Sequence, residues 1–179
     1  MMVNRILAIS GRKGRGKTLG AVYLSQKYDF RLVAFADHLK ELSTKIFPFT
    51  YEQLHGALKE ATYKGYNWSP RDFMVKFGAF MRYWDSCYWI NNADLDTKLS
   101  NVVIHDLRYK NEADFLRQKG AIIIRLERYK RYCPYEDSND PSENDLDGYK
   151  FDYTIPEVGN VLKTDLYKSL DYVVHKFFK

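Results

Sequence analysis

The sequence predicts an α/β fold with a parallel central sheet, on three observations. Short apolar runs alternate with longer amphipathic stretches along the chain, a pattern typical of βαβ units. The run at 121–124 reads Ala-Ile-Ile-Ile, which suits a parallel strand buried on both faces. A length of 179 residues suits a single domain with a substantial core.

The expected elements follow in chain order. Strands are predicted at 6–10, 32–35, 101–105, 121–126 and, more weakly, 152–155. Helices are predicted at 17–27, 38–46, 51–61, 70–86, 111–119 and 162–176. The helix from Pro70 has a clear start, because Ser69 can cap it and proline suits a first helical position. The segment 127–150 interrupts the alternation of strand-like and helix-like patterns, and it is first basic and then acidic. We expect it to be a mobile excursion from the sheet.

Charge and cysteine content restrict the class of protein. The formal charge of +5 and a pI near 9.0 favour anionic partners, and no long single-sign tail suggests a disordered nucleic-acid-binding arm. Only Cys87 and Cys133 are present, without CxxC spacing, so we expect neither a disulfide framework nor a zinc site. No apolar run approaches the length of a membrane span, and a cytoplasmic protein without a membrane partner is expected.

The segment 11–18, Gly-Arg-Lys-Gly-Arg-Gly-Lys-Thr, matches the phosphate-binding pattern G-x-x-x-x-G-K-[ST] in full. It follows a predicted strand and precedes a predicted helix, as that pattern requires. Lys17, on an exposed loop, would reach the β- and γ-phosphates of ATP, and the Thr18 hydroxyl would ligate Mg²⁺. The motif predicts a three-layer P-loop NTPase fold in which ATP contacts Gly11, Lys13, Gly14, Arg15, Gly16, Lys17 and Thr18.

A second constellation runs from Val102 to Glu112. Its apolar strand delivers Asp106 to the carboxyl end of the sheet, where ligands bind in open α/β folds. There Asp106 could hold Mg²⁺ through water or orient Arg108. The alternative is that Asp106 caps the helix that follows. The specificity signature N-K-x-D is absent, which counts against a GTPase.

The order of several segments resembles the bacteriophage deoxynucleoside monophosphate kinases, members of the P-loop nucleoside monophosphate kinase superfamily. Besides the phosphate loop, the resemblance is carried by 35–40 (FADHLK), 69–71 (SPR), Gly78 and Arg82, 106–112 (DLRYKNE), Ser142-Glu143, and 151–155 running into 158–160. It spans nearly the whole chain. This sequence departs from the family at Glu157-Val158, where the family often has Asn before the late glycine.

The resemblance implies transfer of the ATP γ-phosphoryl group to a deoxynucleoside monophosphate, with Mg²⁺, for nucleotide supply to DNA synthesis. The resemblance also implies a helical acceptor-binding region at 37–100. Within the chain it assigns acceptor binding to Asp37, Lys40, Arg71, Arg82 and Arg108. ATP and a deoxynucleoside monophosphate would be the partners, stable nucleic-acid binding is not expected, and a homodimer stays open.

The chemistry of phosphoryl transfer agrees with that implication. An acceptor phosphate is already a nucleophile, so cations that position and neutralise charge matter more than a strong base. Arg128 and Arg131, within a mobile lid at 127–150, would cover the transferring group. Arg82 lies in an aromatic segment that we expect to be buried, and Trp89 could stack on the acceptor base.

Each side chain also has a plainer interpretation. Arg71 and Arg82 could be solvated charges, Trp89 a core residue and Asp37 a helix cap. Two other functions stay open for the whole chain. One is a P-loop kinase with another acceptor, such as dephospho-coenzyme A or a small hydroxylated metabolite. The other is a nucleic-acid-dependent ATPase, which the basic charge and the aromatic residues would suit.

Overall fold

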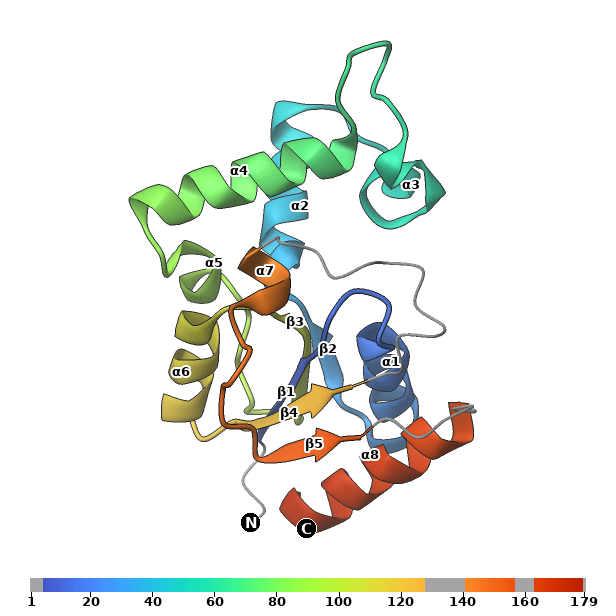
Figure 1. Ribbon diagram of the computed structural model, residues 1–179, viewed down its shortest axis with the longest axis vertical. Coiled ribbons are helices and arrows are strands. Elements are labelled where there is room, and N and C mark those ends of the chain that lie inside the picture. The colour runs from blue at the N-terminus through green and yellow to red at the C-terminus, as the bar shows by residue number, and fades with distance from the viewer. Residues whose placement is uncertain (1–4, 128–140, 157–162, 179) are drawn as a thin grey trace. The chain divides into compact units, whose positions relative to one another are not determined.

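The computed structural model describes residues 5–127, 141–156 and 163–178. Its centre is a parallel sheet of five strands in the order β2-β3-β1-β4-β5 (Figure 1). This confirms the predicted α/β class and parallel pairing. The strands are β1 Ile6–Ser10, β2 Arg31–Val33, β3 Val102–Leu107, β4 Ile122–Leu126 and β5 Tyr153–Ile155.

Helices cover both faces of this sheet, which gives three layers (Figure 1). Helices α1 (Lys17–Tyr28) and α8 (Lys163–Phe177) lie on one face, where Leu24 and Leu170 join a core with Leu7 from β1. Helix α6 (Lys110–Gln118) packs against β1 and β4 on the other face. The short helix α7 spans Pro141–Asn144.

A second compact unit comprises residues 35–93, whereas residues up to 34 and from 94 onwards form the sheet unit. Most of the predicted acceptor-binding region, 37–100, belongs to this helical unit. Its own core contains Phe49, Leu54, Tyr63 and Met74. Its helices are α2 Phe35–Ile46, α3 Tyr51–His55, the 3₁₀ helix η1 Ala57–Glu60, α4 Pro70–Trp84 and α5 Tyr88–Asn91.

Local chemistry explains where these helices begin and end. At the start of α4, the Ser69 hydroxyl accepts the Asp72 N–H, which confirms the predicted cap, and the Asp72 carboxylate accepts the Ser69 N–H in return. The single helix predicted over 51–61 is wrong, because it breaks into α3 and η1 at Gly56, whose backbone is extended. Strand β3 extends through Leu107, further than predicted, and therefore includes Asp106.

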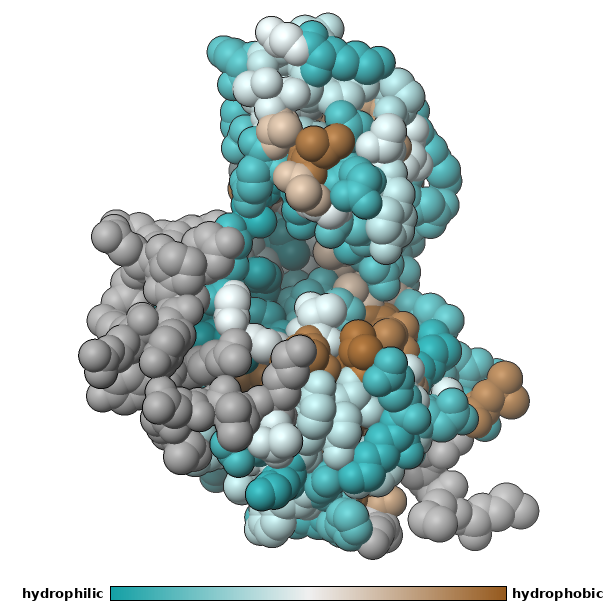
Figure 2. Space-filling model, turned by 90° about the vertical axis from the view of Figure 1, so that its right-hand side faces the viewer, coloured by the Kyte–Doolittle hydropathy of each residue, from teal (hydrophilic) through white to brown (hydrophobic). Residues whose placement is uncertain are grey.

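The face of the molecule in Figure 2 is mostly hydrophilic, with separate small apolar areas. The large apolar side chains that are exposed include Leu99 in the sheet unit and Phe80, Tyr83 and Trp84 on α4. Within the described residues, no helix is both long and apolar enough to span a membrane.

Candidate active site

The segment 11–18, the phosphate loop, leads from β1 into the first turn of α1. Its backbone adopts conformations that favour glycine. Gly11, Gly14 and Gly16 have φ values of 149°, 78° and 91°, in the region that side chains rarely adopt. At Gly11 an added Cβ would also lie 2.7 Å from the carbonyl oxygen of Leu126, at the end of β4. Glycine is therefore needed here both for the curl of the loop and for its close approach to the neighbouring strand.

Lys17 begins α1 and is buried, with 9% of its surface exposed, so the expectation of an exposed lysine is wrong. Its Nζ donates hydrogen bonds to the carbonyl oxygens of Gly11 and Arg12, the latter at 3.0 Å. Burial, and after it the nearby Arg108 cation, lower the Lys17 pKa to about 8 against the opposing charges of Glu143 and Asp106. An ammonium partly stripped of water interacts strongly with an incoming phosphate.

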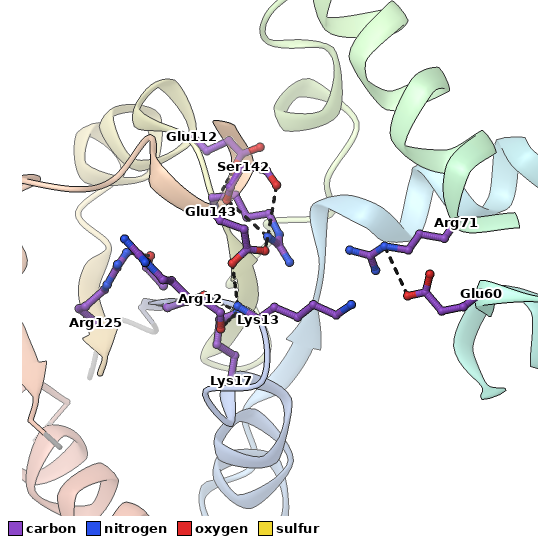
Figure 3. A network of polar contacts seen from close by, with 12 residues as sticks. Arg12, Lys13, Lys17, Glu60, Arg71, Glu112, Arg125, Ser142 and Glu143 are labelled. Carbon is purple, nitrogen blue, oxygen red and sulfur yellow. Dashed lines mark hydrogen bonds and ion pairs between the residues drawn. The ribbon is translucent and has the colours of Figure 1, made fainter. Parts of the chain in front are cut away.

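Arg108 follows β3 and lies beside the phosphate loop, held by residues of α7. Its Nη1 forms an ion pair with Glu143 and lies 3.4 Å from both the carbonyl and hydroxyl oxygens of Ser142. The other Glu143 oxygen, Oε2, accepts the Lys13 backbone N–H at 2.7 Å (Figure 3). One carboxylate therefore joins Arg108 to the phosphate loop.

Glu112 caps the helix that follows Asp106. It is buried in the first turn of α6, and its Oε2 accepts the backbone N–H groups of Arg108 at 3.0 Å and Tyr109 at 3.1 Å. These bonds satisfy donors that a helix start leaves open. The alternative role of Asp106 as the cap is therefore wrong, and Asp106 stays at the carboxyl end of β3 beside the loop.

Arg125 and Asp147 are site residues that the sequence interpretation missed. Arg125 is buried on β4, and its Nη atoms donate to Ser10 Oγ at 3.3 Å and to Asp147 Oδ1 at 3.2 Å. Asp147 also accepts a bond from Arg12 Nη2 at 2.9 Å. The available signal was an arginine inside an apolar run, since a buried charge requires a partner.

The described residues of the acidic part of 127–150 bond to other residues of the sheet unit. Glu143 and Asp147 bond to the phosphate loop, and Asp145 Oδ2 accepts the backbone N–H of Lys110 at 2.7 Å. Residues 141–147 are therefore tied to the sheet unit. The remainder of the predicted lid, including Arg128 and Arg131, lies largely outside the described residues.

The predicted acceptor residues, apart from Arg108, lie in the helical unit. Asp37 and Lys40 are in the first turns of α2 and their charged groups lie 3.8 Å apart. Asp37 is inside the helix, which begins at Phe35, so it does not cap a helix at 38. Arg71 Nε lies 3.5 Å from Glu60 Oε1. Their contact with an acceptor stays a prediction.

Two arguments from aromatic residues need correction. Arg82 is half-buried in the last turn of α4, but its neighbours Tyr83 and Trp84 are 80% and 73% exposed, so the segment is not a buried one. Trp89 is only 2% exposed and donates its Nε1–H to the Gly78 carbonyl at 3.1 Å. It belongs to the core of the helical unit, which leaves no ring face for a base to stack on.

Thr18 and Asp106 are the oxygen donors that the sequence assigns to a metal ion. Thr18 is exposed in the first turn of α1, and Asp106 lies close enough to Lys17 to affect its pKa. Among the described residues, no three His, Cys, Asp or Glu side chains form a group that could hold a metal.

Comparisons with known proteins give one relative that covers nearly the whole chain. It is a protein of Acanthamoeba polyphaga mimivirus named "Putative deoxynucleotide monophosphate kinase", 28% identical over 186 residues, which cover 92% of this chain and 93% of the relative. No family model matches the chain.

Solved kinase structures also align over most of the chain. Dephospho-CoA kinase from Campylobacter jejuni aligns with a TM-score of 0.49 and 13% identity over 98% of both chains. Shikimate kinase from Bacteroides thetaiotaomicron aligns with a TM-score of 0.45 and 12% identity over 96% of this chain and 97% of that one.

Proposed function

We propose that this chain is a P-loop kinase that transfers the γ-phosphoryl group of ATP to a deoxynucleoside monophosphate, giving the diphosphate and ADP. The observation that carries the proposal is the pairing of a complete phosphate loop with Arg108, which Glu143 holds beside it. The name of the mimivirus relative supports the acceptor class. The product would supply nucleotides for DNA synthesis.

On the donor side, the loop backbone and Lys17 would bind the ATP phosphates. With a pKa of about 8, Lys17 is mostly protonated at neutral pH and can neutralise charge on the transferring group. Bound Mg²⁺ would supply further neutralisation of the β- and γ-phosphates, with Thr18 and Asp106 as its protein oxygen donors.

On the acceptor side, an oxygen of the monophosphate would attack the γ-phosphorus while the bond to the β–γ bridging oxygen breaks and ADP leaves. Arg108 would bind the acceptor phosphate, and Asp37, Lys40, Arg71 and Arg82 are the other proposed acceptor contacts. Arg128 and Arg131 would neutralise the transferring group. No general base is needed, because the attacking oxygen is already anionic.

The test is a coupled assay of ADP release across all deoxy- and ribonucleoside monophosphates, with Lys17→Met as the inactive control. We expect at least one deoxynucleoside monophosphate to stimulate ADP release strongly. Dephospho-coenzyme A and single-stranded DNA serve as competing additions. Stimulation by either of these, with no response to any monophosphate, would overturn the proposed acceptor.

A further inference from the structure

Glu143 is a buried carboxylate next to the phosphate loop that the proposed reaction does not itself use. Its side chain is 8% exposed. Burying a carboxylate is costly unless each oxygen finds a donor, and both oxygens of Glu143 do. One pairs with the Arg108 guanidinium and the other accepts the Lys13 backbone N–H. The two donors lie in different loops of the sheet unit, one after β3 and one between β1 and α1.

One nitrogen of the Arg108 guanidinium, Nη1, lies within hydrogen-bond distance of three acceptor oxygens. Ser142 offers its carbonyl and hydroxyl oxygens to the same Nη1 that pairs with Glu143. The backbone N–H of Arg108 is bonded to Glu112. An arginine otherwise has many rotamers to lose on ordering, so this set of acceptors reduces the entropy cost of using it at a reaction centre.

The position of Glu143 matters electrostatically as well as sterically. Both Arg108 and Glu143 lie close enough to Lys17 to affect its pKa, in opposite directions. Without the carboxylate, two neighbouring cations would repel each other beside the loop. Glu143 allows Arg108 and Lys17 to stay together at the place where phosphates would bind.

The rest of the segment is anchored independently of Glu143. Asp145 accepts a hydrogen bond from the backbone at the start of α6, and Asp147 accepts bonds from Arg12 and Arg125. Leu146, the residue between these two, is buried. Replacing Glu143 should therefore leave α7 and the following residues in place, which makes its role testable.

We infer that Glu143 is a positioning residue that holds the Arg108 guanidinium against the phosphate loop, linking the ATP-binding loop to the arginine that binds the acceptor. It acts through Arg108 and does not itself contact the substrate. The inference rests on the proposed function, since that function gives Arg108 its place at the acceptor phosphate.

The kinetic test is a double-mutant cycle of Glu143→Ala and Arg108→Ala. We expect each single change to lower kcat/KM for the acceptor about 10- to 100-fold, the range of a charge-assisted hydrogen bond. The double variant should be no worse than Arg108→Ala alone, because Glu143 acts through that arginine. Additive losses in the double variant would overturn the inference. Higher activity in Glu143→Ala would also overturn it, because it would mean that the Glu143 carboxylate competes with the acceptor phosphate for Arg108.

A spectroscopic test does not depend on turnover. In wild-type protein labelled with ¹⁵N at arginine, the Arg108 Nη signals, assigned by their loss in Arg108→Lys, should be separately resolved because the ion pair restricts rotation of the guanidinium. Glu143→Gln keeps the size of the side chain but replaces one acceptor oxygen with an amide donor, and should average these signals.

The matched control is Asp145→Asn, which neutralises a carboxylate in the same segment that bonds to Lys110 and not to Arg108. It should keep both the resolved Arg108 signals and kcat/KM within about threefold of the wild type. If the spectrum is unchanged in Glu143→Gln, the positioning role is wrong. If the spectrum changes as expected but no monophosphate is phosphorylated, the proposed function fails and the contact between the two residues stands.

Discussion

The Lys17 ammonium donates a hydrogen bond to the carbonyl oxygen of Gly11, so the loop's lysine closes back onto the loop's first residue. This bond lies in a buried environment that lowers the Lys17 pKa. The loop therefore contains a charge that bonds to two carbonyl oxygens and is partly deprived of water. Binding of a phosphate would add negative charge beside this ammonium, beyond that which Glu143 and Asp106 already supply.

The first prediction concerns stability and pH. The Lys17 pKa is about 8 in the folded protein against 10.5 for an ordinary lysine, so the unfolded chain binds more protons between these values. The stability of wild type relative to Lys17→Met should therefore rise with pH, by about 2.5 kcal/mol between pH 7 and pH 10. Urea unfolding of both proteins across this range measures the difference. A constant difference would mean that Lys17 titrates normally.

The second prediction concerns protons taken up on binding. Phosphates should raise the Lys17 pKa, so ATP binding at pH 8 should take up about half a proton, and binding near pH 6.5 almost none through this group. Calorimetry in two buffers of different ionisation enthalpy measures the uptake. Lys17→Arg is the control, because a guanidinium stays charged throughout. Equal uptake by both proteins would assign the proton to another group.

The third prediction separates backbone strain from steric contact. Gly11→Ala would place a Cβ 2.7 Å from the Leu126 carbonyl oxygen at positive φ, whereas Gly120→Ala would meet open space at a φ of 75°. We expect about 1–2 kcal/mol of destabilisation at Gly120 and clearly more at Gly11, together with loss of nucleotide binding only at Gly11. Thermal unfolding and ADP titration provide both measurements. Equal destabilisation would show that the contact with Leu126 is unimportant.

The fourth prediction tests the acceptor role of the helical unit. Arg82→Ala should raise KM for the acceptor about 10- to 100-fold and change KM for ATP little, because a charge-assisted bond to the monophosphate is lost. Lys76→Ala removes an exposed cation from the same helix and is the matched control. Parallel increases in both KM values for Arg82→Ala would indicate a general disturbance of the fold.

The sequence predicted the central sheet well because its signals are local. Strands β1, β3 and β4 each contain a run of three or more apolar residues, and the glycines and lysine of the phosphate loop lie close together in the chain. The break at Gly56 was missed, since a glycine within a helical pattern is often tolerated.

The network behind the loop was harder to predict, because its members are far apart in sequence. Asp147 meets Arg12 only when the chain returns to the loop after β4, and no periodicity indicates such a pairing. Trp89 was misjudged for a related reason: a large aromatic residue suits a core and a stacking surface equally well, and only the burial of its ring distinguishes the two.

The central claim is most directly tested by following the phosphoryl group itself. With ATP labelled at the γ-phosphorus, we expect the label to appear in a deoxynucleoside diphosphate, with ADP formed in equal amount. Transfer should fall by about 10³-fold or more in Lys17→Ala, the scale seen for cations on transferring phosphates. Label that appears only as inorganic phosphate, or transfer that persists at a tenth of the wild-type rate without Lys17, would contradict it.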